Sequence, residues 1–183
     1  GLETEFLGKK MRAPLWISSM TGGTKVAGDL NRLWARVAAE FGLGLGLGSC
    51  RILFDDPTRW SDFDLRPLLG EDLPFYANLG VAQIEELLKK AEVSKVVELV
   101  ERLRVDGLII HINPLQEWFQ PGGDRFDKPP LETITQFLEK FPYKVIVKEV
   151  GQGFGPRSLE ALMRLPLAAI DFGAYGGTNF TKL

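Results

Sequence analysis

One stretch of the chain places four polar side chains within seven residues, directly after an apolar run. These are His111, Asn113, Gln116 and Glu117. Polar groups crowded into a buried loop cost free energy unless each finds a partner, so the pattern predicts a loop that binds a ligand. His111 is the only histidine, and the alternative is a structural residue whose hydrogen bonds are satisfied within the fold.

The side chains available to a metal ion favour magnesium over zinc. One histidine and one cysteine cannot supply the nitrogen and sulfur ligands of a usual zinc site. Glu117 offers a hard carboxylate, and Mg²⁺ commonly takes its other ligands from water and substrate phosphate. We therefore expect Glu117 to be a Mg²⁺ ligand.

A lysine stands at the end of a second apolar run. Lys148 follows residues 144–147, so its ammonium group is expected at the carboxyl end of a strand. There it could balance the charge of a delocalised anion. A plain ion pair with the neighbouring Glu149 is the alternative.

The run 42–48 alternates glycine with leucine. A period of two places the leucines on one face of a strand and bare backbone on the other. The bare face either packs tightly against the core or admits a flat ring or a phosphate near Ser49. Neither a G-x-G-x-x-G nor a Walker motif is present, which removes the best sign of nucleotide triphosphate chemistry.

The single cysteine has a basic neighbour. Cys50 lies beside Arg51, and an adjacent positive charge can lower the pKa of a thiol. Cys50 and His111 would then form a nucleophile pair. We do not favour this interpretation.

Stretches with helical and strand-like patterns alternate along the chain. Ser94 is placed to cap a helix, and Pro129-Pro130 and Pro156 mark the starts of two more. We expect helices near 25–41, 83–90, 95–104, 131–140 and 157–164. We expect strands at 15–18, 43–47, 75–77, 107–110, 144–147 and 168–172, with an irregular insertion at 52–73.

The spacing of the strands favours a barrel. Their starts are about 31 residues apart, which matches a (β/α)8 barrel of ~250 residues. Polar or glycine-rich clusters follow all six strands. In a doubly wound sheet the ligand gathers at one switch point, whereas in a barrel every such loop faces the same mouth. We predict an incomplete α/β (β/α)8 barrel of about six βα units, a single domain over 1–183 truncated at both ends.

Composition excludes several classes of partner. Lys+Arg number 22 and Asp+Glu 24, a net charge of −2, so no global positive field would hold nucleic acid or an anionic membrane. A single cysteine excludes an internal disulfide, and no apolar run reaches the ~20 residues of a membrane span. A cytoplasmic location is the simplest expectation. Six strands of an eight-stranded barrel leave open edges, so we expect a homo-oligomer.

Six short motifs in unbroken order resemble those of the type 2 isopentenyl diphosphate isomerases, which are FMN-dependent (β/α)8 enzymes. The motifs lie at 18–23 (S-S-M-T-G-G), 46–51 (G-L-G-S-C-R), 77–80 (A-N-L-G), 111–117 (H-I-N-P-L-Q-E), 147–151 (V-K-E-V-G) and 176–178 (G-G-T). The combination of H-x-N-x-x-Q-E with S-M-T-G-G and G-S-x-R is specific.

The resemblance implies an isomerase that interconverts isopentenyl and dimethylallyl diphosphate in isoprenoid biosynthesis. Reduced FMN would act as acid and base, Mg²⁺ would bind the diphosphate, and NADPH would only reduce the flavin. Catalytic roles are implied for His111 and Gln116. FMN would be held by Ser19, Met20, Thr21, Ser49, Asn78, Lys148 and Thr178. The substrate would contact Ser49, Cys50, Arg51, His111, Asn113 and Gln116, and Glu117 would bind Mg²⁺.

The chain departs from the family pattern in two ways. Cys50 stands where the family commonly has Gln, and the family's basic amino-terminal segment and last two βα units lie outside residues 1–183. Two other functions stay open. One is another FMN barrel enzyme, such as an oxidase or dehydrogenase of small hydroxy acids, although these usually need a histidine late in the barrel and His111 follows the fourth strand. The other is a non-catalytic flavin- or phosphate-binding fragment.

Overall fold

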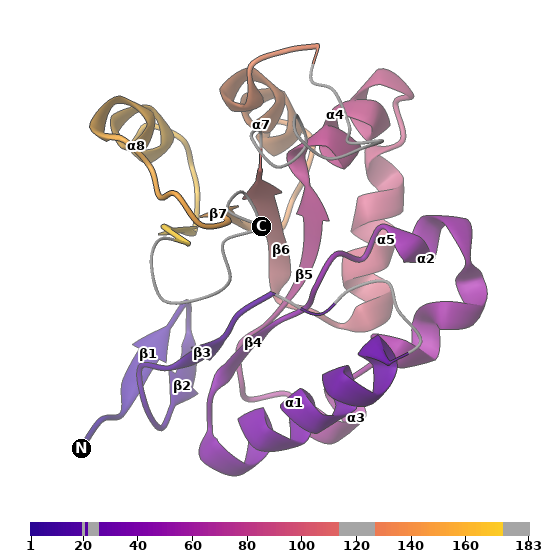
Figure 1. Ribbon diagram of the computed structural model, residues 1–183, viewed down its shortest axis with the longest axis vertical. Coiled ribbons are helices and arrows are strands. Elements are labelled where there is room, and N and C mark those ends of the chain that lie inside the picture. Colours follow the sequence, from indigo (N-terminus) through magenta and orange to yellow (C-terminus); the bar gives the residue numbers. More distant parts are fainter. Residues whose placement is uncertain (20, 22–25, 114–126, 174–183) are drawn as a thin grey trace. The chain divides into compact units, whose positions relative to one another are not determined.

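The principal sheet contains six strands, arranged in the order in which they occur along the chain. The computed structural model describes residues 1–19, 21, 26–113 and 127–173 (Figure 1). The strands are β3 (Trp16–Ile17), β4 (Gly44–Gly46), β5 (Phe75–Gly80), β6 (Gly107–Ile112), β7 (Lys144–Glu149) and β8 (Ala169–Asp171). Their order in the sheet is β3-β4-β5-β6-β7-β8. The pairs β3/β4, β4/β5 and β7/β8 are parallel. A doubly wound sheet would reverse its strand order at a switch point, so this topology confirms the predicted fold class, an incomplete (β/α)8 barrel.

Five helices overlap the ranges expected from apolar periodicity. They are α1 (Ala27–Phe41), α4 (Val81–Lys89), α5 (Val93–Leu103), α7 (Pro130–Leu138) and α8 (Pro156–Met163). Pro130 and Pro156 are the first residues of their helices, as predicted. The cap predicted at Ser94 is wrong, because α5 begins at Val93. Val93 is buried three residues before the buried Val96, so the apolar face of the helix already includes it and Ser94 lies inside the first turn.

The structure contains short elements that the sequence pattern does not predict. An antiparallel hairpin joins β1 (Thr4–Phe6) to β2 (Lys9–Met11). The insertion at 52–73 is not irregular. It contains α2 (Ile52–Asp55), the 3₁₀ helix η1 (Pro57–Asp62) and α3 (Arg66–Leu69), each too short to show a helical period in the sequence.

A buried arginine anchors this insertion. The Arg66 side chain is 1% exposed, and its guanidinium lies 2.9 Å from the Asp106 carboxylate. It also donates to the carbonyls of Gly70, Leu73 and Arg104. Asp106 in turn accepts from the backbone N–H of Phe75, the first residue of β5. The insertion is therefore fixed at the amino end of β5, the end opposite to the one where ligands bind in such barrels.

The chain divides into two compact units. The first comprises Gly1–Leu79 with Glu98–Leu108, and the second Gly80–Val97 with Ile109–Leu183. In the first unit α1 lies against α3 and η1, and in the second α4 lies against α7 (Figure 1). Across the described ranges, no helix combines the length and apolar character needed to cross a membrane. That residues 1–183 form a single domain stays a prediction.

Candidate functional site

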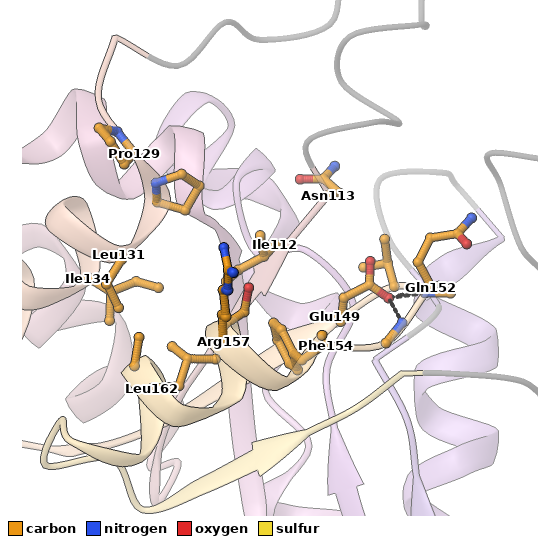
Figure 2. Close-up of a pocket in the computed structure, with 17 residues that line it drawn as sticks. Ile112, Asn113, Pro129, Leu131, Ile134, Glu149, Gln152, Phe154, Arg157 and Leu162 are labelled. Carbon is orange, nitrogen blue, oxygen red and sulfur yellow. Dashed lines mark hydrogen bonds between the residues drawn. The ribbon is translucent and has the colours of Figure 1, made fainter.

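The second unit contains a pocket of about 550 Å³ at the carboxyl ends of β6 and β7 (Figure 2). Helices α7 and α8 and the loop 150–155 form its walls. Asn113 and Glu149 bring polar groups to it from the strand ends, and the exposed Arg157 does so from α8. Its apolar lining includes Ile112, Pro129, Leu131, Ile134, Phe154 and Leu162. A site with apolar walls and a few polar groups at strand ends is typical of ligand pockets in barrels.

His111 lies near the end of β6 and is uncharged at neutral pH. Burial lowers the pKa of its imidazole to about 4, and the positive charge of Lys148 contributes in the same direction. The ring is close to the backbone of Gly80, where an added Cβ would lie 2.9 Å from Nε2. A neutral imidazole can donate one hydrogen bond and accept another, so His111 can orient a ligand without adding charge.

Lys148 is a buried cation on β7. The residue is 5% exposed, and its Nζ donates to the backbone carbonyl of Glu149 at 2.8 Å. Burial lowers the pKa of the ammonium group, while the charges of Asp171 and Glu149 act against this shift. Asp171 stands opposite Lys148 in the β7/β8 register. The alternative of a plain ion pair with Glu149 is wrong, because Lys148 uses the carbonyl of that residue.

The carboxylate of Glu149 is occupied by the loop that follows. One oxygen, Oε2, accepts hydrogen bonds from the backbone N–H groups of Gly151, Gln152 and Gly153, at 2.6, 2.6 and 2.8 Å (Figure 2). Gly153 has φ of 76°, a backbone conformation that favours glycine. Residue types alone do not reveal this arrangement. The only signal in the sequence is an acidic residue followed by closely spaced glycines.

In the first unit, two predicted cofactor ligands follow β3. Ser19 is half-buried, and its Oγ is a buried atom with no hydrogen-bond partner among the described residues. Thr21 instead donates its hydroxyl hydrogen to Oδ1 of Asn31 on α1. Ser19 therefore offers a hydroxyl to a ligand, whereas that of Thr21 is already engaged within the protein.

The loop after β4 and the strand β5 hold the next group of predicted residues. Asn78 is 2% exposed, and its carbonyl accepts from the backbone N–H of Cys50 at 2.8 Å. Ser49 is half-buried, and its Oγ accepts from the backbone N–H of the exposed Arg51. The loop is thus bonded to β5 through Cys50, with Ser49 half-buried and Arg51 exposed.

Cys50 is not an activated nucleophile. It is 0% exposed, its Sγ lies 3.6 Å from the Gly48 carbonyl, and burial raises the pKa of the thiol to about 12, against a smaller opposing effect of the Asn78 backbone. A reactive cysteine needs an accessible thiolate. The nucleophile pair with His111 is therefore wrong. The buried thiol also does not present its sulfur at the protein surface.

Of the two interpretations of the glycine–leucine strand, the structure supports tight packing against the core at Gly44. A Cβ on this residue would overlap the ring of Trp16 on β3. Trp16 also meets Phe6 and Tyr76, with ring centroids 5.3 and 5.8 Å away. The bare backbone of β4 at this point therefore accommodates an indole ring from the protein itself.

Four predicted site residues lie outside the described ranges. They are Met20, Gln116, Glu117 and Thr178. Within the described part of the chain, no three His, Cys, Asp or Glu residues gather into a possible metal site. The assignment of Mg²⁺ to Glu117 thus stays a prediction. Among the described residues, Lys148 lies close enough to His111 for its charge to act on the imidazole, and Cys50 is bonded to Asn78. Asn113 lines the pocket, whereas His111 and Lys148 are not among the residues that line it.

A solved structure supports the barrel assignment. A mutant mandelate oxidase with a monooxide FMN adduct matches 92% of this chain and 49% of its own with a TM-score of 0.58, at 12% identity. At this identity the likeness concerns the fold. No family model matches the chain.

Several curated proteins named isopentenyl-diphosphate delta-isomerase match the chain along its whole length. The protein from Nostoc sp. is 39% identical over 182 residues, which is 100% of this chain and 51% of the relative. The protein from Deinococcus radiodurans is also 39% identical over 182 residues, 53% of its length. The one from Rickettsia felis is 38% identical over 178 residues, 50% of its length. The chain thus spans about half the length of the curated relatives it matches. Together with the barrel topology, these matches show that the chain is similar, along its whole length, to about half the length of these curated proteins named isopentenyl-diphosphate delta-isomerase.

Proposed function

We propose that the protein interconverts isopentenyl diphosphate and dimethylallyl diphosphate. The observation that carries the proposal is the 39% identity, over the whole chain, to a curated relative named for this activity. The order of the motifs at 18–23, 46–51 and 111–117 supports it. Moving a double bond requires a proton delivered to one carbon and a proton removed from another, with no net change of oxidation state.

The residues at the strand ends fit FMN as the cofactor. Ser19 has a buried hydroxyl without a partner among the described residues, as expected of a group that a ligand satisfies. Asn78 and Lys148 are buried polar groups on β5 and β7. We assign these three to FMN, together with Met20, Ser49 and Thr178. Thr21 is assigned through its hydroxyl oxygen, which can still accept a hydrogen bond while it donates to Asn31. When bound, reduced FMN would supply the acid and the base of the reaction, and NADPH would serve only to reduce it.

The chain itself would bind and orient the substrate. The neutral His111, with Asn113 and Gln116, would hold the reacting part through hydrogen bonds. Lys148 would balance negative charge in a site of low dielectric. The diphosphate would be anchored by Ser49, Arg51 and a Mg²⁺ ion on Glu117. Cys50 would act indirectly, by holding the loop of Ser49 and Arg51 against β5, because its side chain is 0% exposed and its backbone N–H and carbonyl are bonded to Asn78 and Leu53.

Two substitutions in the substrate loop test the proposal. His111→Ala and Gln116→Ala should each slow isomerisation on the order of 10²-fold or more, as positioning residues do, while FMN stays bound. Isomerisation is measured with isopentenyl diphosphate, Mg²⁺ and reduced FMN, and flavin content by absorbance. Loss of FMN with activity in proportion to occupancy would instead place these residues at the cofactor.

The role of Lys148 is tested by separating charge from packing. Lys148→Met keeps the length of the side chain but removes the ammonium group, and Lys148→Ala removes both. Both variants should bind FMN more weakly or reduce it more slowly, because the anionic ring loses a nearby cation. Full activity and affinity in Lys148→Met would contradict the charge role. Steady NADPH consumption during turnover would point to a hydroxy-acid oxidoreductase, and bound flavin without isomerisation to a binding fragment.

A further inference from the structure

Glu149 is a buried acid that the proposed function leaves without a task. It is the last residue of β7 and is 8% exposed. Its carboxylate accepts three backbone hydrogen bonds from the loop that follows, all at 2.8 Å or less. Hydrogen bonds to an ionised acceptor are roughly twice as strong as neutral ones. The carboxylate thus determines the course of residues 150–153.

The backbone carbonyl of the same residue has a second role. It accepts the hydrogen bond of Lys148 Nζ at 2.8 Å. A Cβ on residue 173, which follows β8, would overlap this carbonyl oxygen, so only glycine permits the close approach there. The carbonyl is therefore held between the lysine and the chain that leaves the next strand.

These contacts link the side-chain carboxylate of Glu149 to its backbone carbonyl. The carboxylate fixes the loop that begins at Val150, and this fixes the plane of the peptide bond between residues 149 and 150. The carbonyl oxygen belongs to that peptide bond. Its direction sets where Lys148 Nζ finds its hydrogen-bond acceptor, because a four-carbon side chain has little rotamer preference of its own. The charge of Asp171 on β8 also attracts the ammonium group. The ammonium group keeps two further N–H donors for a ligand.

We propose that Glu149 is the positioning residue for Lys148, acting through the closed loop 150–153 to hold its ammonium group in place. The value of this role for catalysis rests on the proposed function, which assigns Lys148 to the cofactor. The geometric part does not rest on it and can be measured in the protein without flavin or substrate.

The first test concerns the loop in the unaltered protein. Amide hydrogen exchange of Gly151, Gln152 and Gly153, followed by NMR, should be at least about tenfold slower than in an unstructured peptide of the same sequence, because their hydrogens are bonded to a buried acceptor. Exchange at peptide-like rates would overturn the proposal. No variant is required, so a folding failure cannot obscure the result.

The second test measures the lysine. In Glu149→Gln, labelling of Lys148 by limiting acetic anhydride should rise severalfold relative to Lys144, an exposed lysine on the same strand that serves as the internal reference. Glu149→Asp keeps the charge and should restore most of the protection. Glu160→Gln makes the same change of charge at an exposed position of α8 and should alter nothing. An unchanged Lys148/Lys144 ratio in Glu149→Gln would overturn the proposal.

The third test links the two residues to the cofactor. Glu149→Gln should weaken FMN binding severalfold in a fluorescence titration, and should have no further effect when Lys148 is already Met. Independent, additive losses would show that Glu149 does not act through Lys148. If the loop amides and the labelling behave as expected but the unaltered protein does not isomerise isopentenyl diphosphate, the proposed function fails and the positioning role stands.

Discussion

The imidazole of His111 lies against the backbone of Gly80, so that a Cβ on residue 80 would be 2.9 Å from Nε2. The N–H of Gly80 also donates to Oε1 of Gln83, at the start of α4. Gly80 has φ of −78°, a conformation open to any residue. The glycine is therefore needed for space and not for backbone freedom.

Gly80→Ala should consequently impair the site more than the fold. We expect its methyl group, which would overlap Gln83 Oε1 and lie 2.9 Å from His111 Nε2, to displace both side chains. The proposed isomerase activity should fall on the order of 10²-fold, and the disturbed cap of α4 should cost about 1 kcal/mol of stability. Gly155→Ala is the matched control for the fold, because a Cβ there meets nothing within 4 Å. Activity and urea unfolding are measured for both. Unchanged activity in Gly80→Ala would show that the ring moves without consequence.

The low pKa of His111 predicts a dependence of stability on pH. The unfolded histidine binds a proton below about 6.5, whereas burial, aided by Lys148, lowers the folded pKa to about 4. The unfolded state therefore binds more protons between these values. The contribution of His111 to stability is complete above pH 6.5 and is lost as the pH falls to 4, by about 3 kcal/mol in all. Urea unfolding of the protein and of His111→Asn across this range isolates the effect, because the other titrating groups are common to both. If the free energies of unfolding of the two proteins change in parallel between pH 6.5 and 4, the predicted contribution of His111 is contradicted.

The thiol of Cys50 should be inert in the folded protein. With its pKa raised to about 12 by burial, the thiolate fraction at pH 8 is on the order of 10³ times smaller than for an ordinary thiol. A disulfide reagent such as DTNB should therefore react with the urea-unfolded chain and leave the folded one unmodified over the same time. Rapid stoichiometric reaction of the folded protein would restore the nucleophile interpretation.

Arg66 should be among the most sensitive positions for stability. Arg66→Met removes one partner of Asp106 and one hydrogen bond from each of three carbonyls, and we expect a loss of about 3–5 kcal/mol. Arg66→Lys keeps the charge but lacks the planar fork, and should recover only part of the loss. Arg36→Met, on the exposed side of α1, should stay within about 0.5 kcal/mol. A small effect at Arg66 in chemical denaturation would show that the buried contacts are replaceable.

The sequence predicts the strands and long helices well because the residues that these elements bury are apolar and recur in a regular pattern. The strands at 107–110 and 144–147 are continuous apolar runs, and both are found where expected, extended by two residues into the polar motif. The β1–β2 hairpin is not predicted, because its strands are three residues long and largely polar. Its turn, at Leu7 and Gly8, has φ of 52° and 90°, yet Leu-Gly is not one of the residue pairs that signal such a turn.

The site is predictable in its location but not in its internal bonding. Polar residues after apolar runs correctly indicate the strand ends at His111 and Lys148. Residue types cannot show that Lys148 bonds to the carbonyl of Glu149 and not to its carboxylate, because that choice depends on the turn of the loop. Likewise, the alternating glycines of β4 do not reveal that the ring over Gly44 belongs to Trp16.

The loop after β7 has a consequence for how this site can diversify. Its shape depends on one carboxylate and on backbone N–H groups, and backbone groups are the same whatever side chains the loop carries. The side chains of Gln152 and Phe154 line the pocket but supply none of these three bonds. Replacement of these two side chains therefore changes the groups that a ligand meets in the pocket but keeps the three hydrogen bonds that shape the loop. A library randomised at 152 and 154, with Glu149 retained, is the place to evolve new ligand preferences on this framework.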